Sequence, residues 1–486
     1  MILLHLTMKY FKINPLVPFR NYGDFGYLTD NRHFGYNFAD QEFKLGDTII
    51  SESGAEIVSC LEKKPHSLED ISNQLRTLYD NDDIEDVISY FLNTLCEKGF
   101  IIQGNSYYEC ENRNEPTIIP NEQGQNSCAE CEPTMQTQVF LAQRFGNNPF
   151  PTSLHIEVVN ECNERCIHCY IPHKFKTELM DEDLFYNILG QAKKMNLLHI
   201  TISGGEPLLH PSILNFLKLC REYDMSVNVL SNLTLLSDDI LEEMSKNPLL
   251  SVQASIYSMD EATHDKITAQ KGSLIKTISS VYKLIDKHIP VQISCPILKN
   301  NYNNYQDVQK WALDHNILAA TDYSIIAKYD HNTDNLKCRL SEAEITNVIS
   351  TEISTGTNFL KDLKKETEEN KKKSSDDYVC SICNSSICIS PKGEVYPCVG
   401  WPDKILGKLQ NETLQDIWFH SKLVKQLRSI KRKQFTNCMT CNQKDFCTIC
   451  MVRNANESPT GNPFEVSRYF CEIAKIKKDV LKNPTL

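Results

Sequence analysis

Residues 161–170 of the chain read ECNERCIHCY and place Cys162, Cys166 and Cys169 within eight residues. The segment before them, LHIEVV at 154–159, has the composition of a buried strand, so the cysteines occupy the loop that follows it. Iron–sulfur cubes use four cysteine thiolates. Because the sequence offers no fourth cysteine nearby, one iron would keep an open position, as catalytic zinc does, and could chelate a small molecule. A zinc knuckle or unrelated thiols are the alternative.

Residues 151–335 repeat a strand-then-helix pattern. The expected strands are 154–159, 198–203, 226–232, 251–257, 291–295 and 321–326, and the expected helices are 181–195, 212–222, 274–287 and 303–315. This alternation predicts parallel strands joined by crossover helices, an α/β fold. Six such units can form a partial barrel or an open doubly wound sheet. Both arrangements place ligand sites at the carboxyl ends of the strands.

Further candidate site residues follow the next three predicted strands. The sequence SGGEP at 203–207 contains Gly204, Gly205 and Glu206, while Ser231 and Ser255 end the third and fourth strands. Glycines let a backbone approach a ligand closely, and a carboxylate can accept hydrogen bonds from an ammonium group. The two serines could equally cap helices.

C-x3-C-x2-C followed by GGEP resembles the radical S-adenosylmethionine (SAM) superfamily over residues 151–330. The resemblance implies a partial (β/α)6 barrel and a 4Fe-4S cluster whose open iron binds the amino and carboxylate groups of SAM. It implies that a 5′-deoxyadenosyl radical abstracts hydrogen from the substrate. It also implies that Gly204, Gly205 and Glu206 meet the methionine amino group, and that Ser231 and Ser255 contact ribose or carboxylate.

Residues 380–486 contain nine cysteines and few long periodic segments, which is typical of a region organised by metal. Their spacing resembles the SPASM domain, although two residues rather than three separate Cys447 from Cys450. The resemblance implies two auxiliary 4Fe-4S clusters, the first held by Cys380, Cys383, Cys398 and Cys450, the second by Cys438, Cys441, Cys447 and Cys471. Cys388 competes with Cys380, and a missing ligand would open an iron to a substrate thiolate. A pair of zinc ribbons is the alternative.

Residues 1–104 are expected to form a small unit of their own. Phe25–Thr29 and Arg32–Phe38 are predicted to pair as a hairpin through Asp30-Asn31, and three amphipathic helices follow, which resembles a winged helix. Residues 1–110 carry nine Lys and Arg against seventeen Asp and Glu, which argues against nucleic acid. The unit also resembles the RiPP recognition element, a domain that binds leader peptides of ribosomally made natural products. The resemblance implies that a leader strand adds to the hairpin edge beside the third helix.

The rest of the chain is expected to connect these parts. Residues 105–150 are predicted to be a linker, and so are residues 336–379, whose charge run at 360–377 suggests a solvated segment or helix end. Cys128 and Cys131, with Cys110 upstream, are interpreted as a solvent-exposed pair or a third metal site. The net charge of −12, the lack of a long apolar run and the lack of an export signal predict a cytoplasmic protein with no membrane partner.

Together these features predict a radical SAM enzyme that modifies a precursor peptide bearing a leader sequence. Thioether crosslinking is the first expectation, because two auxiliary clusters favour an oxidative outcome. Carbon–carbon crosslinking, epimerisation and a sulfatase-maturase type of protein modification are the alternatives, and a non-catalytic electron carrier is the rival outside enzymes. An external one-electron reductant of flavodoxin or ferredoxin type is expected as a partner.

Overall fold

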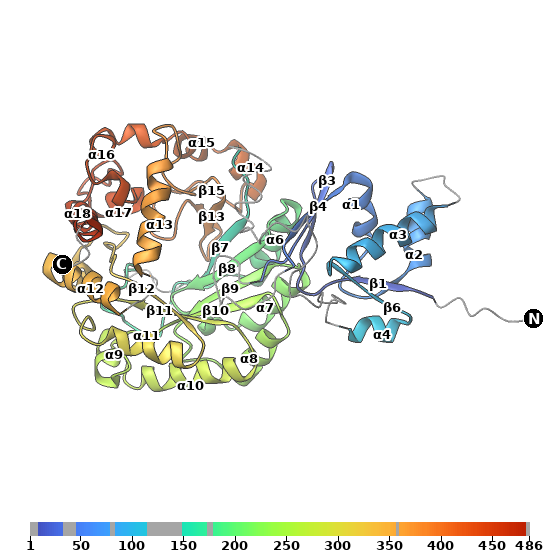
Figure 1. Cartoon of the computed structure of the whole chain (residues 1–486), viewed down its shortest axis with the longest axis horizontal. Coiled ribbons are helices and arrows are strands. Elements are labelled where there is room, and N and C mark those ends of the chain that lie inside the picture. Colours follow the sequence, from blue (N-terminus) through green and yellow to red (C-terminus); the bar gives the residue numbers. More distant parts are fainter. Residues whose placement is uncertain are drawn as a thin grey trace, which may run out of the picture.

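The computed structural model describes residues 8–32, 45–77, 83–113, 148–172, 178–355 and 359–482. The chain forms a small amino-terminal unit beside a larger body (Figure 1). Within the described ranges, no helix has the length and apolar character needed to cross a membrane.

The larger body is built on one nine-stranded sheet. Its first six strands along the chain are β7 (Ser153–Val159), β8 (His199–Gly204), β9 (Ser226–Ser231), β10 (Leu250–Ser255), β11 (Val291–Pro296) and β12 (Leu318–Asp322). They lie in sequence order and pair in parallel. A doubly wound sheet would reverse its order at a switch point. The partial barrel is therefore confirmed, and the doubly wound alternative is excluded.

Helices connect the barrel strands and cover one face of the sheet (Figure 1). They are α6 (Glu182–Lys194), α7 (Ile213–Glu222), α8 (Asp238–Ser245), α9 (Glu261–Thr268), α10 (Ser273–Asp286) and α11 (Tyr305–Asp314). Two of them, α8 and α9, were not predicted, because eight residues are too few to give a clear helical period. The last strand begins at Leu318, three residues before its predicted start.

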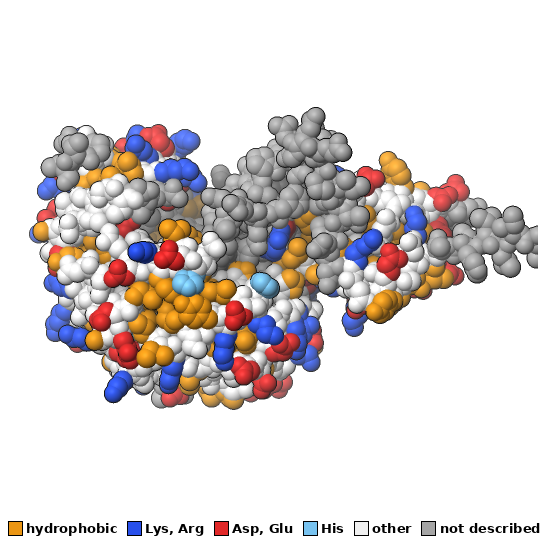
Figure 2. Space-filling view, turned by 60° about the horizontal axis from the view of Figure 1, so that its bottom comes forward, with side chains coloured by type: hydrophobic (Ala, Val, Ile, Leu, Met, Phe, Trp, Pro, Cys, Tyr) orange, Lys and Arg blue, Asp and Glu red, His pale blue; other side chains and the backbone are white. Residues whose placement is uncertain are grey.

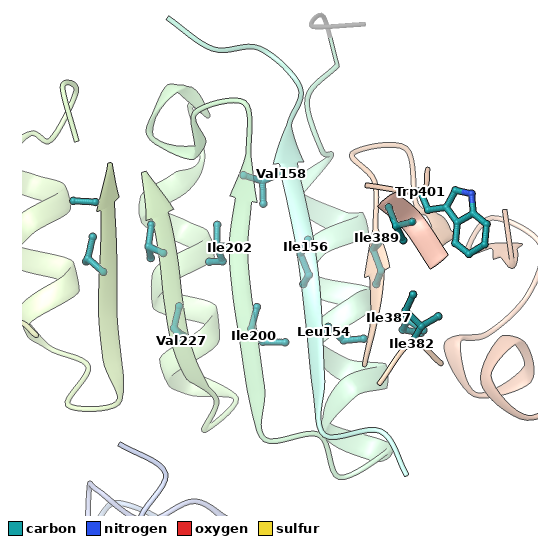
Figure 3. Close-up of a cluster of buried hydrophobic side chains, with 14 of the residues drawn as sticks. Leu154, Ile156, Val158, Ile200, Ile202, Val227, Ile382, Ile387, Ile389 and Trp401 are labelled. Atoms are coloured by element: carbon teal, nitrogen blue, oxygen red, sulfur yellow. The ribbon is translucent and has the colours of Figure 1, made fainter. Parts of the chain in front are cut away.

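The core explains why β7 and β8 alternate as they do. Leu154, Ile156 and Val158 of β7 belong to one buried apolar cluster with residues of β8 and β9 (Figure 3). Because successive side chains of a strand point to opposite faces, His155 and Glu157 face the other way. One face of the sheet is thus an apolar layer under the helices, and the other carries polar groups.

The carboxyl-terminal region continues the barrel sheet. Its strand β13 (Ser386–Ile389) pairs in parallel with β7, and β14 (Glu394–Tyr396) and β15 (Gly407–Lys408) extend the sheet outward. β13 and β14 form a hairpin, and Gly393 supplies the positive φ of 72° in its turn. Ile387, Ile389 and Trp401 share the apolar cluster of the barrel (Figure 3).

Helices pack around this extension of the sheet. They are α12 (Glu342–Ser354), α13 (Phe359–Lys372), α14 (Leu414–His420), α15 (Lys422–Arg428), α16 (Thr436–Met439), α17 (Met451–Glu457) and α18 (Arg468–Lys482), with a 3-10 turn η5 (Lys444–Phe446). The charge run expected as a solvated segment is mostly α13. Leu363, Thr367 and Asn370 anchor one face of that helix while its lysines remain exposed.

Two three-stranded sheets build the amino-terminal unit. One consists of β5 (His66–Ser67), β1 (Tyr10–Ile13) and β6 (Ile101–Gly104), the other of β2 (Phe19–Asn21), β3 (Phe25–Thr29) and β4 (Asp47–Ser51). The helices are α1 (Glu52–Ser59), α2 (Leu68–Arg76), α3 (Ile84–Glu97) and α4 (Tyr107–Asn112).

The hairpin partner expected for β3 differs from the structure. β3 pairs with β2 and β4, and Arg32 lies in a turn. Residues 33–38, the rest of the expected partner strand, lie outside the described residues. The β2–β3 turn depends on Gly23, which has a φ of 89° and donates its backbone N–H to the Asn21 side chain at 2.8 Å. A turn glycine was therefore a better signal than Asp30-Asn31.

Asp224 fixes the amino-terminal unit to the barrel. Arg20 is 1% exposed, donates to the carbonyl oxygens of Leu197 and Asp224 at 2.8 and 2.7 Å, and lies 3.2 Å from the Asp224 carboxylate. Lys63 approaches the same carboxylate at 2.8 Å. These barrel residues immediately precede β8 and β9. The unit therefore docks at the amino-terminal ends of the strands.

Candidate active site and cysteine groups

Cys162, Cys166 and Cys169 lie together on the loop after β7, at the carboxyl end of the sheet. All three are half-buried. Burial raises the pKa of Cys166 well above its usual value, and Glu164, Cys169 and Cys162 raise it further. The backbone N–H of Ile167 donates to the Ile267 carbonyl at 2.9 Å, so α9 supports the loop. A fourth thiol, Cys338, lies behind the loop with its sulfur 3.7 Å from the Ile167 carbonyl oxygen.

Two further side chains surround Cys166, and the sequence analysis singled out neither of them. They are Glu164, within the loop, and Tyr257, which follows β10. The Cys166 thiol donates to Glu164 at 3.5 Å, and Ser273 at the start of α10 donates to the other carboxylate oxygen. The Tyr257 hydroxyl lies 3.9 Å from the Cys166 sulfur. A tyrosine two residues beyond a barrel strand was a usable signal. Glu164 had none, because its partner Ser273 is 109 residues away.

Gly204 and Gly205 let two loops cross in close contact. A Cβ on Gly205 would lie 2.1 Å from the Glu161 carbonyl oxygen, and one on Gly204, whose φ is 140°, would lie 2.0 Å from the Val159 carbonyl oxygen. The Gly205 N–H donates to Val159 at 2.7 Å. The glycines thus bring the loop after β8 against the start of the cysteine loop. The close backbone contact that these glycines allow is with residues 159–161 of the same chain.

Glu206 joins the loops after β8 and β9. It is 1% exposed and accepts from the Leu208 N–H at 3.0 Å, from the Ser231 hydroxyl at 2.7 Å and from the Asn232 N–H at 2.7 Å. Burial raises its pKa to about 7, although these hydrogen bonds act to lower it. Ser231 caps no helix here, since its hydroxyl donates to Glu206 and accepts from the Leu233 N–H at 2.8 Å.

Five thiols gather where β13 and β14 meet the barrel. The pKa values of Cys380 and Cys383 are raised to about 12, chiefly by burial, and neighbouring thiols contribute. The interacting thiols are Cys380, Cys383, Cys388, Cys398 and Cys450. Cys388 pairs with His155 in the β13–β7 register, so it shares the polar face of the sheet with that residue. Both Cys380 and Cys388 are present, and the choice between them remains a prediction.

A second group of thiols lies around one cavity beside α17 and α18. Cys438, Cys441, Cys447 and Cys471 line it together with Cys450. Burial raises the pKa of Cys438 to about 11, followed by the effects of Cys447, Cys471 and Cys441. The structure thus brings together each set of four that the sequence proposed, with Cys450 between the two. Among the described residues, no His, Cys, Asp and Glu side chains converge tightly enough to hold a single metal ion.

The remaining cysteines are divided. Cys110 is fully buried in α4 against β6, and its sulfur lies 3.6 Å from the Ile102 carbonyl oxygen. Cys128 and Cys131 lie outside the described residues. The Cys338 thiol donates to the Ile167 carbonyl oxygen at 3.7 Å, and the three thiols on the loop itself suit a cluster with an open iron.

Three protein families match parts of this chain. Residues 156–312 match the radical SAM superfamily, residues 380–442 match SPASM, an iron–sulfur cluster-binding domain, and residues 49–101 match the coenzyme PQQ synthesis protein D family. The first two matches cover the cysteine loop and the SPASM-like spacing. The chain is a radical SAM enzyme with a SPASM domain. Such an enzyme uses a 4Fe-4S cluster with SAM and carries auxiliary iron–sulfur clusters.

Characterised relatives of this radical SAM enzyme include two proteins of Bacillus subtilis strain 168. One is the antilisterial bacteriocin subtilosin biosynthesis protein AlbA, 26% identical over 64% of this chain and 70% of its own length. The other is the sporulation killing factor maturation protein SkfB, 28% identical over 32% of this chain and 38% of its own length.

Solved structures share the fold of the enzyme over nearly its full length. Streptococcus suis SuiB bound to its precursor peptide SuiA has a TM-score of 0.58 at 18% identity, covering 94% of this chain and 99% of SuiB. SuiB has also been solved with S-adenosylmethionine, with the same TM-score at 17% identity. At such identities the likeness concerns architecture, and it includes the amino-terminal unit.

Proposed function

We propose that this enzyme modifies a ribosomally synthesised precursor peptide and joins a cysteine sulfur of that peptide to a carbon of another residue. The supporting observation is the combination in one chain of a PqqD-like unit, a three-thiol loop at the barrel rim and two further thiol groups in a domain that shares the barrel sheet. Relatives named for bacteriocin biosynthesis and killing-factor maturation agree with a peptide substrate.

Cys162, Cys166 and Cys169 are proposed to hold the 4Fe-4S cluster that leaves one iron for SAM. When bound, cluster and SAM supply a 5′-deoxyadenosyl radical that removes a hydrogen atom from a substrate carbon. The loop Gly204–Glu206 is proposed to meet the methionine amino group, with Ser231 and Ser255 toward ribose or carboxylate. Since Glu206 already accepts three hydrogen bonds within the fold, it also fixes the loop that makes this contact.

Forming a thioether removes one hydrogen atom from carbon, one proton from the thiol and one electron. An electron acceptor must therefore lie near the substrate. Two auxiliary 4Fe-4S clusters are proposed to serve this role. Cys380, Cys383, Cys398 and Cys450 would hold the first, and Cys438, Cys441, Cys447 and Cys471 the second. The domain boundaries at 104, 150, 335 and 379 also remain proposals.

The leader peptide is proposed to add as a strand to β4. Among the described residues β4 pairs only with β3 and is the last strand of its sheet on that side. Ile49 of β4 is 40% exposed, and Val87 and Tyr90 of α3 are 54% and 78% exposed. A strand at the margin of a sheet, with an exposed apolar side chain of its own, fits β-augmentation.

An external one-electron donor of flavodoxin or ferredoxin type is proposed to reduce the enzyme. Its proposed location is the cytoplasm, where thiols stay reduced.

The test of the proposed function is anaerobic turnover of the reconstituted full chain with SAM, dithionite and the peptide encoded beside its gene. Loss of two hydrogens per event supports crosslinking, and fragmentation locates the sulfur–carbon bond. Unchanged mass would point to epimerisation and overturn the thioether. Absence of deoxyadenosine would overturn the whole proposal.

Leader binding has a matched pair of variants. Tyr90→Asp places a charge on the exposed face of α3, the helix beside which the leader is proposed to bind, whereas Tyr108→Asp places one on α4 at an equally exposed tyrosine, 78% against 79% exposed. We expect Tyr90→Asp to weaken binding of a fluorescent leader peptide by about tenfold, since losing an apolar contact costs about 1.5 kcal/mol. Tyr108→Asp should bind normally. Equal affinities of both variants would contradict the proposed edge.

A further inference from the structure

The charge of this protein is divided unevenly along the chain. Residues 380–486 carry sixteen Lys and Arg against nine Asp and Glu, a balance of +7. The whole chain carries −12, so residues 1–379 carry −19. The domain with both auxiliary thiol groups is therefore cationic in an otherwise acidic protein. Opposite charge between two surfaces steers their association, so this domain is suited to an acidic partner.

The basic side chains form a stripe on α18. Arg468, Lys475, Lys478 and Lys482 share the interval of three, four or seven residues that places them on one face with Cys471. Arg468, Lys475, Lys482 and Cys471 are exposed and Lys478 is half-exposed. The opposite face of α18 buries Phe470, Ile473, Ala474 and Val480. The stripe therefore faces solvent with an auxiliary thiol inside it.

Glu472 and exposed Asp479 of α18 flank the stripe, so the four cations keep a balance of +2 on this face. Lys475 lies 3.7 Å from Glu472, and both side chains are well exposed, so the pair is weak. Exposed Lys444 lines the cavity of the second thiol group and adds a fifth cation near Cys471. The face of the molecule shown in Figure 2 differs from the α18 stripe, because acidic and basic side chains are intermixed there around an apolar patch.

Cys471 is the one exposed thiol among the proposed cluster ligands in the described part of the chain. The second thiol group is thus the one that reaches the surface, and it does so inside the basic stripe. We propose that the stripe formed by Arg468, Lys475, Lys478 and Lys482 is the docking surface for the acidic electron-carrier protein. The inference rests on the proposed function, since it assumes that the second thiol group holds a cluster.

The transfer at this surface is one electron. Reduced carrier, with its flavin as hydroquinone, gives one electron to an oxidised cluster and becomes the semiquinone, and no atom other than a flavin proton moves. Docking brings the carrier's flavin edge against the Cys471 side of the domain. Because long-range charge steers the encounter, the association should weaken steeply with salt.

The experiment uses the reconstituted full chain and a recombinant acidic flavodoxin. The variant Lys475→Glu/Lys478→Glu is compared with Lys218→Glu/Lys276→Glu, which makes the same charge change on exposed lysines of α7 and α10. Binding of oxidised flavodoxin is measured by surface plasmon resonance at several salt concentrations. Cluster bleaching by reduced flavodoxin and by dithionite is followed in stopped flow.

We expect the α18 variant to lose about tenfold in flavodoxin affinity and bleaching rate at low salt, and to be reduced by dithionite normally. The α7/α10 variant should match wild type. Equal loss in both variants, or none in either, would overturn the docking surface. So would an α18 variant that binds flavodoxin normally but loses affinity for an acidic precursor peptide. Failure of dithionite to bleach wild type would instead overturn the proposed function.

Discussion

Replacing Asp224 by Asn should loosen the amino-terminal unit from the barrel. The carboxylate is 17% exposed and serves both Arg20, at 3.2 Å, and Lys63, at 2.8 Å. Asparagine keeps the size and the backbone hydrogen bonds but removes the negative charge that Arg20 and Lys63 share. Lys63 is 32% exposed and can turn toward solvent, whereas Arg20 is 1% exposed and cannot.

The cost follows from the geometry of the Arg20–Asp224 pair. At 3.2 Å the attraction is about 5 kcal/mol for an effective dielectric constant of about 20. Removing one member of a buried pair costs about 3–5 kcal/mol, because the remaining charge stays buried and unpaired. We take about 3 kcal/mol, since Lys63 can relax. At 1.4 kcal/mol per tenfold, the opening equilibrium rises about a hundredfold.

Hydrogen exchange measures this opening directly. Peptides covering β2 and β3 should exchange about a hundredfold faster in Asp224→Asn, while barrel peptides of β10 and β11 keep their protection. Glu222→Gln is the control, because Glu222 is 47% exposed and lies 3.7 Å from Lys218, a surface pair worth less than about 1 kcal/mol. Unchanged exchange in Asp224→Asn, or equal change in Glu222→Gln, would refute the reasoning.

Three further outcomes are expected. Gly205→Ala should lower SAM cleavage about a hundredfold by displacing the rim loop, whereas Gly190→Ala, whose Cβ meets only a hydroxyl at 3.9 Å, should not. Cys380→Ser should alter the EPR signal of the first auxiliary cluster, and Cys388→Ser should leave it unchanged. Burial would raise the pKa of Asp224, but Lys63, Lys193 and Arg20 lower it overall. The contribution of Asp224 to docking is therefore complete above the pKa of free aspartate and should vanish as the pH falls through the lower pKa of the folded protein. Hydrogen exchange of β2, measured between pH 5 and 2, checks this.

Local signals predicted the barrel well. The strands from 154 to 295 and four amphipathic helices were visible because each repeats its own period, and the cysteines and glycines at the strand ends followed from topology. What failed depended on distant partners. Nothing near Asp224 in the sequence indicates Arg20, which lies 204 residues away. Nothing in residues 386–389 indicates that they pair with β7.

The role of Glu206 shows a different limit. Its residue type fitted an ammonium ligand, and the sequence could not reveal that both carboxylate oxygens already accept hydrogen bonds within the fold. Likewise, the glycines before it were required by the crossing of two backbone segments. A motif can therefore mark the right place on the rim while the contacts that require each residue come from the chain itself.

Through the pairing of β13 with β7, the SPASM domain covers the edge strand of the barrel sheet. A chain cut at residue 379 would bare the β7 edge, with its N–H and C=O groups next to an apolar layer that Ile387 and Ile389 now cover. Such an edge invites pairing with other molecules. The shortened enzyme should therefore precipitate rather than behave as an independent catalytic half, and partial versions of this protein are poor starting points for engineering.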